Sequence, residues 1–219
     1  MCRFVAVISR RDIPLKEYME LLKHQAREGK RGPHKDGFGF WILSKRGEHH
    51  YRSTLPAWEF VGDLPSGHVA FLHARKKGLT GAPVDISNVH PFIRNGYVFM
   101  HNGAVNVKRH PKSIGTTDTE SFFLTLLDMG LDKGLKHIVE NFSFMSLNFV
   151  MWDGKNVIAL HQAKRMMNYF TIFMKKEDDK IIISTEGDES WYEVKNGEMI
   201  IIHPNLSFET RCIFPDMCR

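Results

Sequence analysis

The second residue of the chain brings together two groups that can do acid–base chemistry on each other. The sequence opens Met1-Cys2-Arg3-Phe4, and an apolar run over 4–8 follows directly. Removal of the initiator methionine, which a small second residue permits, would leave a cysteine that carries both a thiol and the free α-amine. A free thiol has a pKa of about 8.5 and an α-amine a pKa of about 7.7–8.0, so the amine is a suitable base beside the nucleophile. The alternative is that Cys2 is only a small apolar residue at the start of a strand.

The elements that must position this cysteine follow from the apolar periodicity and the turn residues. Helices are predicted over 15–27, 118–130 and 133–142, and a loop over 29–37. Strands are predicted over 2–9, 38–43, 49–53, 68–74, 97–100, 146–152, 157–162, 169–174 and 180–184, with three short ones to Thr210. Two helices between two sets of strands predict sheets covered by helices in one α+β domain over residues 2–219.

Composition limits the classes of function. The 219 residues contain no run of 18 apolar residues, so no membrane span is expected, and the absence of a signal-peptide pattern predicts a cytoplasmic protein. Three cysteines argue against a disulfide framework, although Cys212 and Cys218 could pair or simply pack. No metal site is expected, because the adjacent His49-His50 has no ligand partner at metal spacing, and no phosphate or dinucleotide fingerprint suggests a cofactor.

The positive charge is concentrated in one early segment. The net charge is +5, and residues 10–52 hold 11 Lys/Arg against 6 Asp/Glu, which accounts for the whole excess. A solvated helix face and loop explain this segment better than nucleic-acid binding, because no aromatic–basic alternation or nucleic-acid-binding signature accompanies it.

Four segments, taken in order with Cys2, resemble the class II glutamine amidotransferases of the N-terminal-nucleophile hydrolase superfamily, in particular their compact stand-alone members. They are His34-Lys35-Asp36-Gly37-Phe38-Gly39-Phe40-Trp41; Leu72-His73-Ala74-Arg75; Asn88-Val89-His90-Pro91-Phe92 with Met100-His101-Asn102-Gly103; and Thr117-Asp118-Thr119-Glu120. The resemblance spans roughly residues 2–130, and the late strands with Ser184-Thr185-Glu186 fit the second sheet of that family. It implies a four-layer αββα sandwich, with two antiparallel sheets between helix layers.

The resemblance also implies a reaction and its catalytic residues. Cys2 would attack the side-chain amide of glutamine, form an acyl-thioester and release glutamate on hydrolysis, and the ammonia would pass to a separate synthetase subunit. Asn102, through its amide, and Gly103, through its backbone N–H, would form the oxyanion hole. Read without the family, Asn102-Gly103 is a hairpin-turn signal, but strand residues precede the pair and no obvious return strand follows it.

Three further residues would bind the substrate in this reading. Arg75, at the end of a predicted strand, would hold the α-carboxylate of glutamine with its guanidinium fork, unless it is a surface arginine beside Lys76-Lys77. Asp118 would hold the α-ammonium, and it is also a candidate helix-capping or first-turn acid. His90 would form part of the pocket scaffold.

Two departures from the family pattern keep other functions open. The position of a carboxylate-binding threonine is occupied by Gly78, with Thr80 two residues on. This favours, as an alternative, a hydrolase of the γ-glutamyl amide of a larger metabolite. If Met1 is retained, the α-amine base is absent, and a non-catalytic binding or regulatory module becomes the better interpretation.

Overall fold

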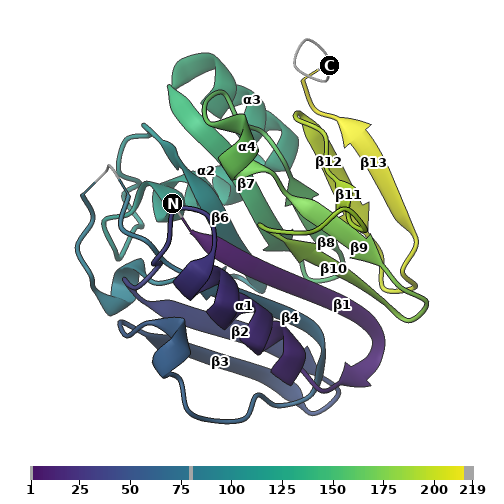
Figure 1. Ribbon diagram of the computed structural model, residues 1–219. Coiled ribbons are helices and arrows are strands. Elements are labelled where there is room, and N and C mark those ends of the chain that lie inside the picture. Colours follow the sequence, from purple (N-terminus) through teal and green to yellow (C-terminus); the bar gives the residue numbers. More distant parts are fainter. Residues whose placement is uncertain (1, 79–80, 215–219) are drawn as a thin grey trace.

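The protein is built around two antiparallel β-sheets that pack face to face (Figure 1). The computed structural model describes residues 2–78 and 81–214. Sheet A runs in the order β11 (Tyr192–Glu193), β9 (Phe173–Lys176), β10 (Lys180–Ser184), β1 (Arg3–Ile13), β4 (Gly67–Ala74), β2 (Phe38–Ser44) and β3 (Gly47–Ser53). Sheet B runs in the order β13 (Phe208–Cys212), β12 (Glu198–Ile202), β8 (Val157–Leu160), β7 (Phe144–Trp152), β6 (Tyr97–Val105) and β5 (Phe92–Arg94).

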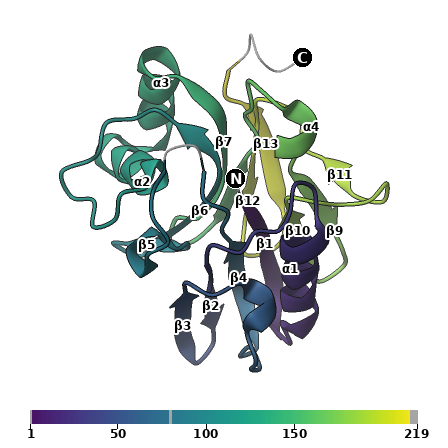
Figure 2. The same cartoon turned by 60° about the vertical axis from the view of Figure 1, so that its left-hand side comes forward.

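Helices cover the outer face of each sheet, as Figure 2 shows with α2 and α3 on one side and α1 on the other. The helices are α1 (Lys16–Glu28), α2 (Asp118–Met129), α3 (Leu131–Asn141) and the single turn α4 (Met167–Phe170), with short 3-10 turns η1 (Ala57–Glu59) and η2 (Ile86–Asn88). Apolar residues of α1 pack on sheet A, and those of α2 and α3 pack on sheet B. The arrangement is a four-layer sandwich, as predicted.

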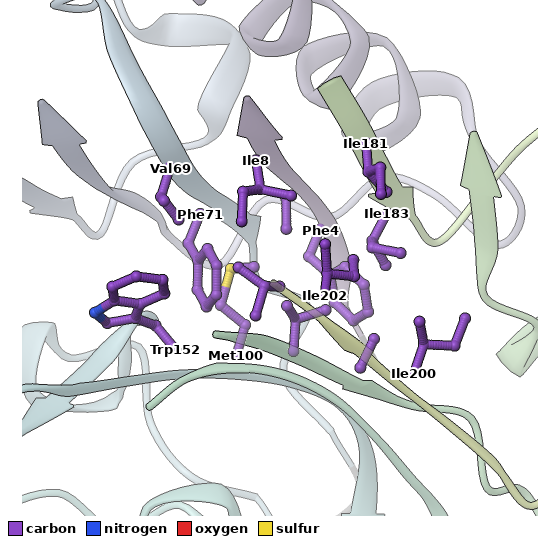
Figure 3. Close-up of a cluster of buried hydrophobic side chains, with 14 of the residues drawn as sticks. Phe4, Ile8, Val69, Phe71, Met100, Trp152, Ile181, Ile183, Ile200 and Ile202 are labelled. Carbon is purple, nitrogen blue, oxygen red and sulfur yellow. The ribbon is translucent and has the colours of Figure 1, made fainter. Parts of the chain in front are cut away.

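Side-chain alternation along β1 shows how one strand serves two cores. Phe4 and Ile8 point between the sheets, whereas Val5 and Val7 point toward α1. This is the two-residue period expected of a strand that is buried on both faces. The core between the sheets contains Phe71, Met100, Trp152 and a group of isoleucines, which Figure 3 shows in close-up. Strand β1 lies inside sheet A, paired with β10 on one side and β4 on the other, so its first residues are held rigidly.

Most predicted elements are confirmed, and two predictions were wrong. The predicted strand over 169–174 is instead the turn α4 followed by β9, and the Tyr169 hydroxyl of that turn reaches the ring of His34. The strand predicted to end before Asn102 continues as β6 to Val105, because it pairs along its length with β7. The short strand β5 was not predicted. The possible pairing of Cys212 with Cys218 involves a residue outside the described part of the chain.

Within residues 2–78 and 81–214, the model contains no helix that is both long and apolar enough to cross a membrane. The same residues contain no group of three or more His, Cys, Asp or Glu side chains that could hold a metal ion.

We predict that Gly39→Ala destabilises the protein. A methyl group at Gly39 on β2 would overlap the carbonyl oxygen of His90 and lie 2.7 Å from that of Tyr51, so the backbone would have to move. Overpacking of this kind costs about 1–3 kcal/mol, which urea unfolding can measure. Gly62→Ala is the control, because the three atoms nearest to its new methyl all belong to the Phe60 ring, at 3.2 Å or more. Equal stability of the two variants would contradict this packing constraint.

Candidate active site

Cys2 is buried at the start of β1, where groups from both sheets reach it. Its side chain is 7% exposed, and its Sγ lies 4.0 Å from the carbonyl oxygen of Lys76. Its backbone N–H donates a hydrogen bond of 2.8 Å to Oδ1 of Asn102, which belongs to sheet B. Burial alone would raise the pKa of the Cys2 thiol, but the positive charge of the chain's amino terminus and the imidazole of His73 outweigh it and lower the pKa from its ordinary value of 9.0 to about 6. The thiol is thus set up to ionise near neutral pH.

Asn102 presents an unused pair of donors beside the nucleophile. A backbone N–H can only donate, so the side-chain atom that faces Cys2 is the oxygen, and the amide nitrogen is the other end. This Nδ2 is buried and has no hydrogen-bond partner in the described part of the chain. A buried donor without a partner is costly, so such an atom is well suited to receive a ligand oxygen.

Gly103 follows Asn102 within β6, opposite Leu147 of β7, and the pair is therefore not a hairpin turn. A Cβ at this position would overlap the carbonyl oxygen of Ser146 and Nε2 of His101. Only glycine fits where β6 and β7 approach this closely. The register of the β6–β7 pairing then shifts between Ala104 and Val105, at the end of the strand.

Arg75 is not a surface arginine. It is 3% exposed, directly after β4, and its guanidinium donates to three carbonyl oxygens. Nη1 lies 3.0 Å from the oxygen of Pro83 and 3.4 Å from that of Asp36, and Nη2 lies 2.9 Å from that of Ala82. These contacts use three of the five N–H donors of a guanidinium and hold the 82–83 loop against the end of the strand. Gly78 lies in the segment that follows, whereas Thr80 is outside the described residues.

Asp118 joins α2 to the end of β6. Its Oδ2 accepts a hydrogen bond of 2.8 Å from the backbone N–H of Val105, two residues beyond Gly103. Asp118 is a first-turn acid of α2, and the N-cap is the preceding Thr117, whose hydroxyl accepts from the Glu120 N–H at 3.2 Å. The negative charge of Asp118 at the N-terminal end of α2 is favourable. Asp118 therefore has a structural role, which is compatible with the predicted role in substrate binding.

His90 is buried in the loop before β5 and stacks on the ring of His73, with 3.9 Å between ring centroids and 22° between ring planes. Neither ring nitrogen of His90 has a partner among the described residues. Burial, followed by the nearby His73, holds the pKa of His90 well below its usual 6.5, so the ring is neutral.

An ion pair that the sequence did not reveal, between buried Arg3 and partly exposed Glu186, fixes the backbone of Cys2. Nε of Arg3 lies 2.7 Å from Oε1 of Glu186, and its Nη1 donates to the carbonyl oxygen of Cys2 at 3.2 Å. The guanidinium also lies over the ring of Tyr169, 4.6 Å from its centroid. Nothing in the sequence around Arg3 distinguished it from other basic residues, because Glu186 and Tyr169 lie more than 160 residues away in the chain.

Comparisons with known proteins show a family relationship. The family model of the class II glutamine amidotransferases matches residues 1–172. YafJ of Escherichia coli K12, which is designated a glutamine amidotransferase, is 23% identical over 224 residues, covering 78% of this chain and 86% of YafJ.

Two solved structures have the same fold at low sequence identity. Glutamine phosphoribosylpyrophosphate amidotransferase of B. subtilis is similar over 99% of this chain with a TM-score of 0.72 and 16% identity; the chain spans only 50% of that enzyme. A class II domain protein of Silicibacter pomeroyi is similar over 98% of this chain and 100% of its own length, with a TM-score of 0.65 and 19% identity.

We predict that buried, neutral His101 makes the protein sensitive to acid. Burial lowers the pKa of His101 to about 4, despite the opposing effect of Asp118, from an unfolded value of 6.5. The unfolded chain therefore binds this proton first as the pH falls. The resulting stability is present above pH 6.5 and is lost between pH 6.5 and 4, at most about 3 kcal/mol at about 1.4 kcal/mol per pKa unit.

Urea unfolding at several pH values between 7 and 4 tests this. His101→Gln should have a shallower fall in unfolding free energy than the wild type, whatever its stability at pH 7. The exposed His49→Gln is the control and should fall as steeply as the wild type. Parallel curves for all three proteins would show that His101 does not titrate as described.

Proposed function

The chain belongs to the class II glutamine amidotransferase family, and from this premise we propose that it releases ammonia from the side-chain amide of glutamine, with Cys2 as the nucleophile. One observation carries the proposal. The N–H of Cys2 donates a hydrogen bond to Oδ1 of Asn102, which leaves the amide nitrogen of Asn102 beside the thiol and without a partner among the described residues. A nucleophile next to a buried, unused donor is the arrangement that acyl transfer requires.

The reaction proceeds in two halves. The thiolate of Cys2 attacks the amide carbon, and the oxyanion that forms accepts hydrogen bonds from Nδ2 of Asn102 and the backbone N–H of Gly103. The intermediate collapses to a thioester as the amide nitrogen takes up a proton and leaves as ammonia. Water then attacks the thioester, and glutamate is released with the thiol restored. Once Met1 is removed, the nitrogen of Cys2 is an α-amine that can carry protons between these steps.

The amino-acid end of the substrate is assigned to Arg75 and Asp118. The two N–H donors that Arg75 does not use on carbonyl oxygens can receive the α-carboxylate, and the second oxygen of Asp118 can receive the α-ammonium. Burial of the guanidinium supports this assignment, because a desolvated charge binds its counter-ion more strongly than an exposed one. His90 is proposed to shape the pocket without contributing charge. We further propose one catalytic domain, located in the cytoplasm, with a separate synthetase subunit as the ammonia acceptor.

A cavity near the nucleophile favours a second candidate, the hydrolysis of a γ-glutamyl amide with a larger amine. It has a volume of about 560 Å³ and is lined by Lys30, Arg31, Met166, Met167, Asn168 and Tyr169. Lys76 contacts both the thiol and the lining of this pocket: its carbonyl oxygen faces Sγ of Cys2, and its Nζ donates to the carbonyl oxygen of Arg31. Glutamate release from glutamine and from a panel of γ-glutamyl amides separates the two candidates by their kcat/KM.

We predict that Cys2→Ala abolishes glutamate release while the protein stays folded. The methyl group of alanine fills most of the space that the cysteine side chain occupies. Asn102→Ala should lower kcat by roughly 10²–10³, the usual effect of losing one oxyanion donor. The assay follows glutamate release by protein whose intact mass shows that Met1 is removed. Asn106→Ala, on the exposed residue just beyond β6, is the control and should keep full activity. A fully active Asn102→Ala enzyme would refute the oxyanion assignment. Inactive wild-type protein with Met1 removed would favour a non-catalytic binding module.

We also predict that the amino-acid clamp acts mainly on KM. Arg75→Lys and Asp118→Asn remove contacts that are made equally in the ground and transition states, so KM for glutamine should rise at least tenfold. A smaller loss of kcat is expected because a loosely held substrate is misaligned with Cys2. Arg109→Lys and Asp128→Asn alter exposed residues of the same types and are the matched controls. Unchanged KM in both Arg75→Lys and Asp118→Asn would mean that the clamp lies elsewhere.

A further inference from the structure

The cavity lined by Lys30, Arg31 and residues 166–169 is not used by glutamine in the proposed reaction. Ammonia is far too small to need a cavity of about 560 Å³, which is the size of a site for a small organic ligand. The amino-acid end of glutamine is assigned to Arg75 and Asp118, and neither of these residues lines the cavity. A ligand larger than glutamine is needed to occupy it.

Arg3 lies between this cavity and the nucleophile. Nη1 of its guanidinium donates to the carbonyl oxygen of Cys2 at 3.2 Å, and Nη2 donates to the carbonyl oxygen of Lys30. The same guanidinium lies 4.6 Å from the centroid of the Tyr169 ring, which is part of the cavity lining. The cavity wall is therefore one side chain away from the backbone of Cys2.

Lys76 forms a second bridge, from the thiol to the cavity. Its carbonyl oxygen lies 4.0 Å from Sγ of Cys2, and its Nζ donates to the carbonyl oxygen of Arg31. The loop after α1 and the turn α4, which carry the cavity lining, lie beside the beginning of β1 in both views (Figure 1 and Figure 2). A substrate that extends from the thiol on this side reaches the cavity.

The lining of the cavity has an excess of positive charge. Lys30 and Arg31 are cations, and no acidic side chain lines the cavity in the part of the chain that the structure describes. Glu186 accepts the backbone N–H of Lys30 at 2.8 Å, but its charge is already paired with Arg3, whose Nε lies 2.7 Å from Oε1. Such a lining repels ammonium and attracts an anion.

The two cations keep strong donors available for a ligand. Nζ of Lys30 donates to the carbonyl oxygen of Asn168 at the long distance of 3.4 Å, and Nη1 of Arg31 contacts Sδ of Met166, a weak acceptor, at 3.7 Å. Neither cation forms an ion pair with a side chain among the described residues. A guanidinium with open donors can bind a carboxylate through two parallel N–H groups. Met166 and Met167 add adaptable apolar surface beside them.

Both sides of the cavity contain a residue with strained backbone. Arg31 has a φ of 58° and Met166 a φ of 54°, in the left-handed region that residues other than glycine seldom adopt. Strain of this kind gathers at sites that clamp a ligand, and the contact between Arg31 and Met166 joins the two strained segments. The backbone thus supports a binding function for the cavity.

We propose that this cavity binds the amine portion of the substrate and that this portion ends in a carboxylate, so that the substrate is a γ-glutamyl peptide. The inference rests on the proposed function and names the substrate class of its second candidate. Lys30 and Arg31 hold the terminal carboxylate of the leaving peptide, and the two methionines contact its apolar side chain.

The chemistry at the thiol is the same as for glutamine. The thiolate of Cys2 attacks the γ-carbonyl carbon, and the C–N bond breaks as the nitrogen takes up the proton that the thiol lost. The peptide leaves with a free amino group. Water then hydrolyses the thioester, and glutamate is released with the thiol restored.

The test compares γ-glutamyl-leucyl-glycine with its C-terminal amide, which lacks only the terminal negative charge. Glutamate release by the full chain with Met1 removed gives kcat/KM for each peptide, with glutamine as the reference. The wild type should prefer the acid by about tenfold or more, the usual effect of a charge-assisted hydrogen bond, and the preference should fall as the salt concentration rises. Equal kcat/KM for the two peptides, or hydrolysis of glutamine alone, would overturn the proposal.

Charge removal in the cavity tests which residues bind the carboxylate. The double variant Lys30→Gln with Arg31→Gln should reduce the preference for the acid by about fivefold or more, because it loses both charge-assisted contacts. The double variant Arg109→Gln with Lys136→Gln removes two exposed cations outside the cavity and should keep the preference of the wild type. The same preference in both double variants would overturn the assignment of the carboxylate site.

Binding separates a failure of this inference from a failure of the proposed function. If none of the three compounds releases glutamate, the proposed hydrolysis is wrong, and calorimetric titration of the Cys2→Ala protein decides about the cavity. The acid peptide should bind about tenfold more tightly than its amide. Equal affinities, or no binding of either peptide, would overturn the inference.

Discussion

The hydrogen bond from the N–H of Cys2 to Oδ1 of Asn102 joins the two sheets at the point where the chemistry is placed. Cys2 immediately precedes β1 of sheet A, and Asn102 belongs to β6 of sheet B. The bond therefore requires the sandwich to be assembled before the site exists. It also decides the orientation of the Asn102 amide, and so which of its ends faces the incoming substrate. The apolar core between the sheets supplies the energy that holds these two polar groups at bonding distance.

Burial acts in opposite directions on the two kinds of titratable group around this bond. Burial penalises the charged form of each group. By itself it would raise the pKa of the thiol, and it lowers the pKa of the imidazoles. Positive charges close to Cys2 overcome the penalty for the thiolate, whereas nothing comparable overcomes it for His90 and His101. The site consequently holds a thiol that ionises easily among rings that remain neutral. The same thiol and imidazole groups in water would not differ in their ionisation in this way.

The ion pair of Arg3 and Glu186 positions the backbone of Cys2 more than it stabilises the fold. Arg3 is buried and Glu186 is partly exposed, so desolvation offsets much of the attraction between the charges and the pair contributes little net free energy. Its geometric effect is clear, since the same guanidinium binds the carbonyl oxygen of Cys2 and lies over Tyr169. The backbone of the nucleophile is therefore held from both sides, by Asn102 at its nitrogen and by Arg3 at its oxygen. Tyr169, which lies in α4 and not in the predicted strand, contacts both Arg3 and His34.

The sequence alone determined the alternation of β1, the three longer helices and the order of the motifs, because these depend on residues that are close together in the chain. It placed Cys2, Arg75 and Asp118 at the ends of elements for the same reason. The tertiary structure decided what local patterns cannot. Asn102-Gly103 is a turn signal in isolation, yet it lies within a strand because β7 pairs with it across the sheet. The register that sets His73 opposite Phe4 was likewise not readable from the sequence, since a contact between strands that are far apart in sequence is set by packing and not by neighbouring residues.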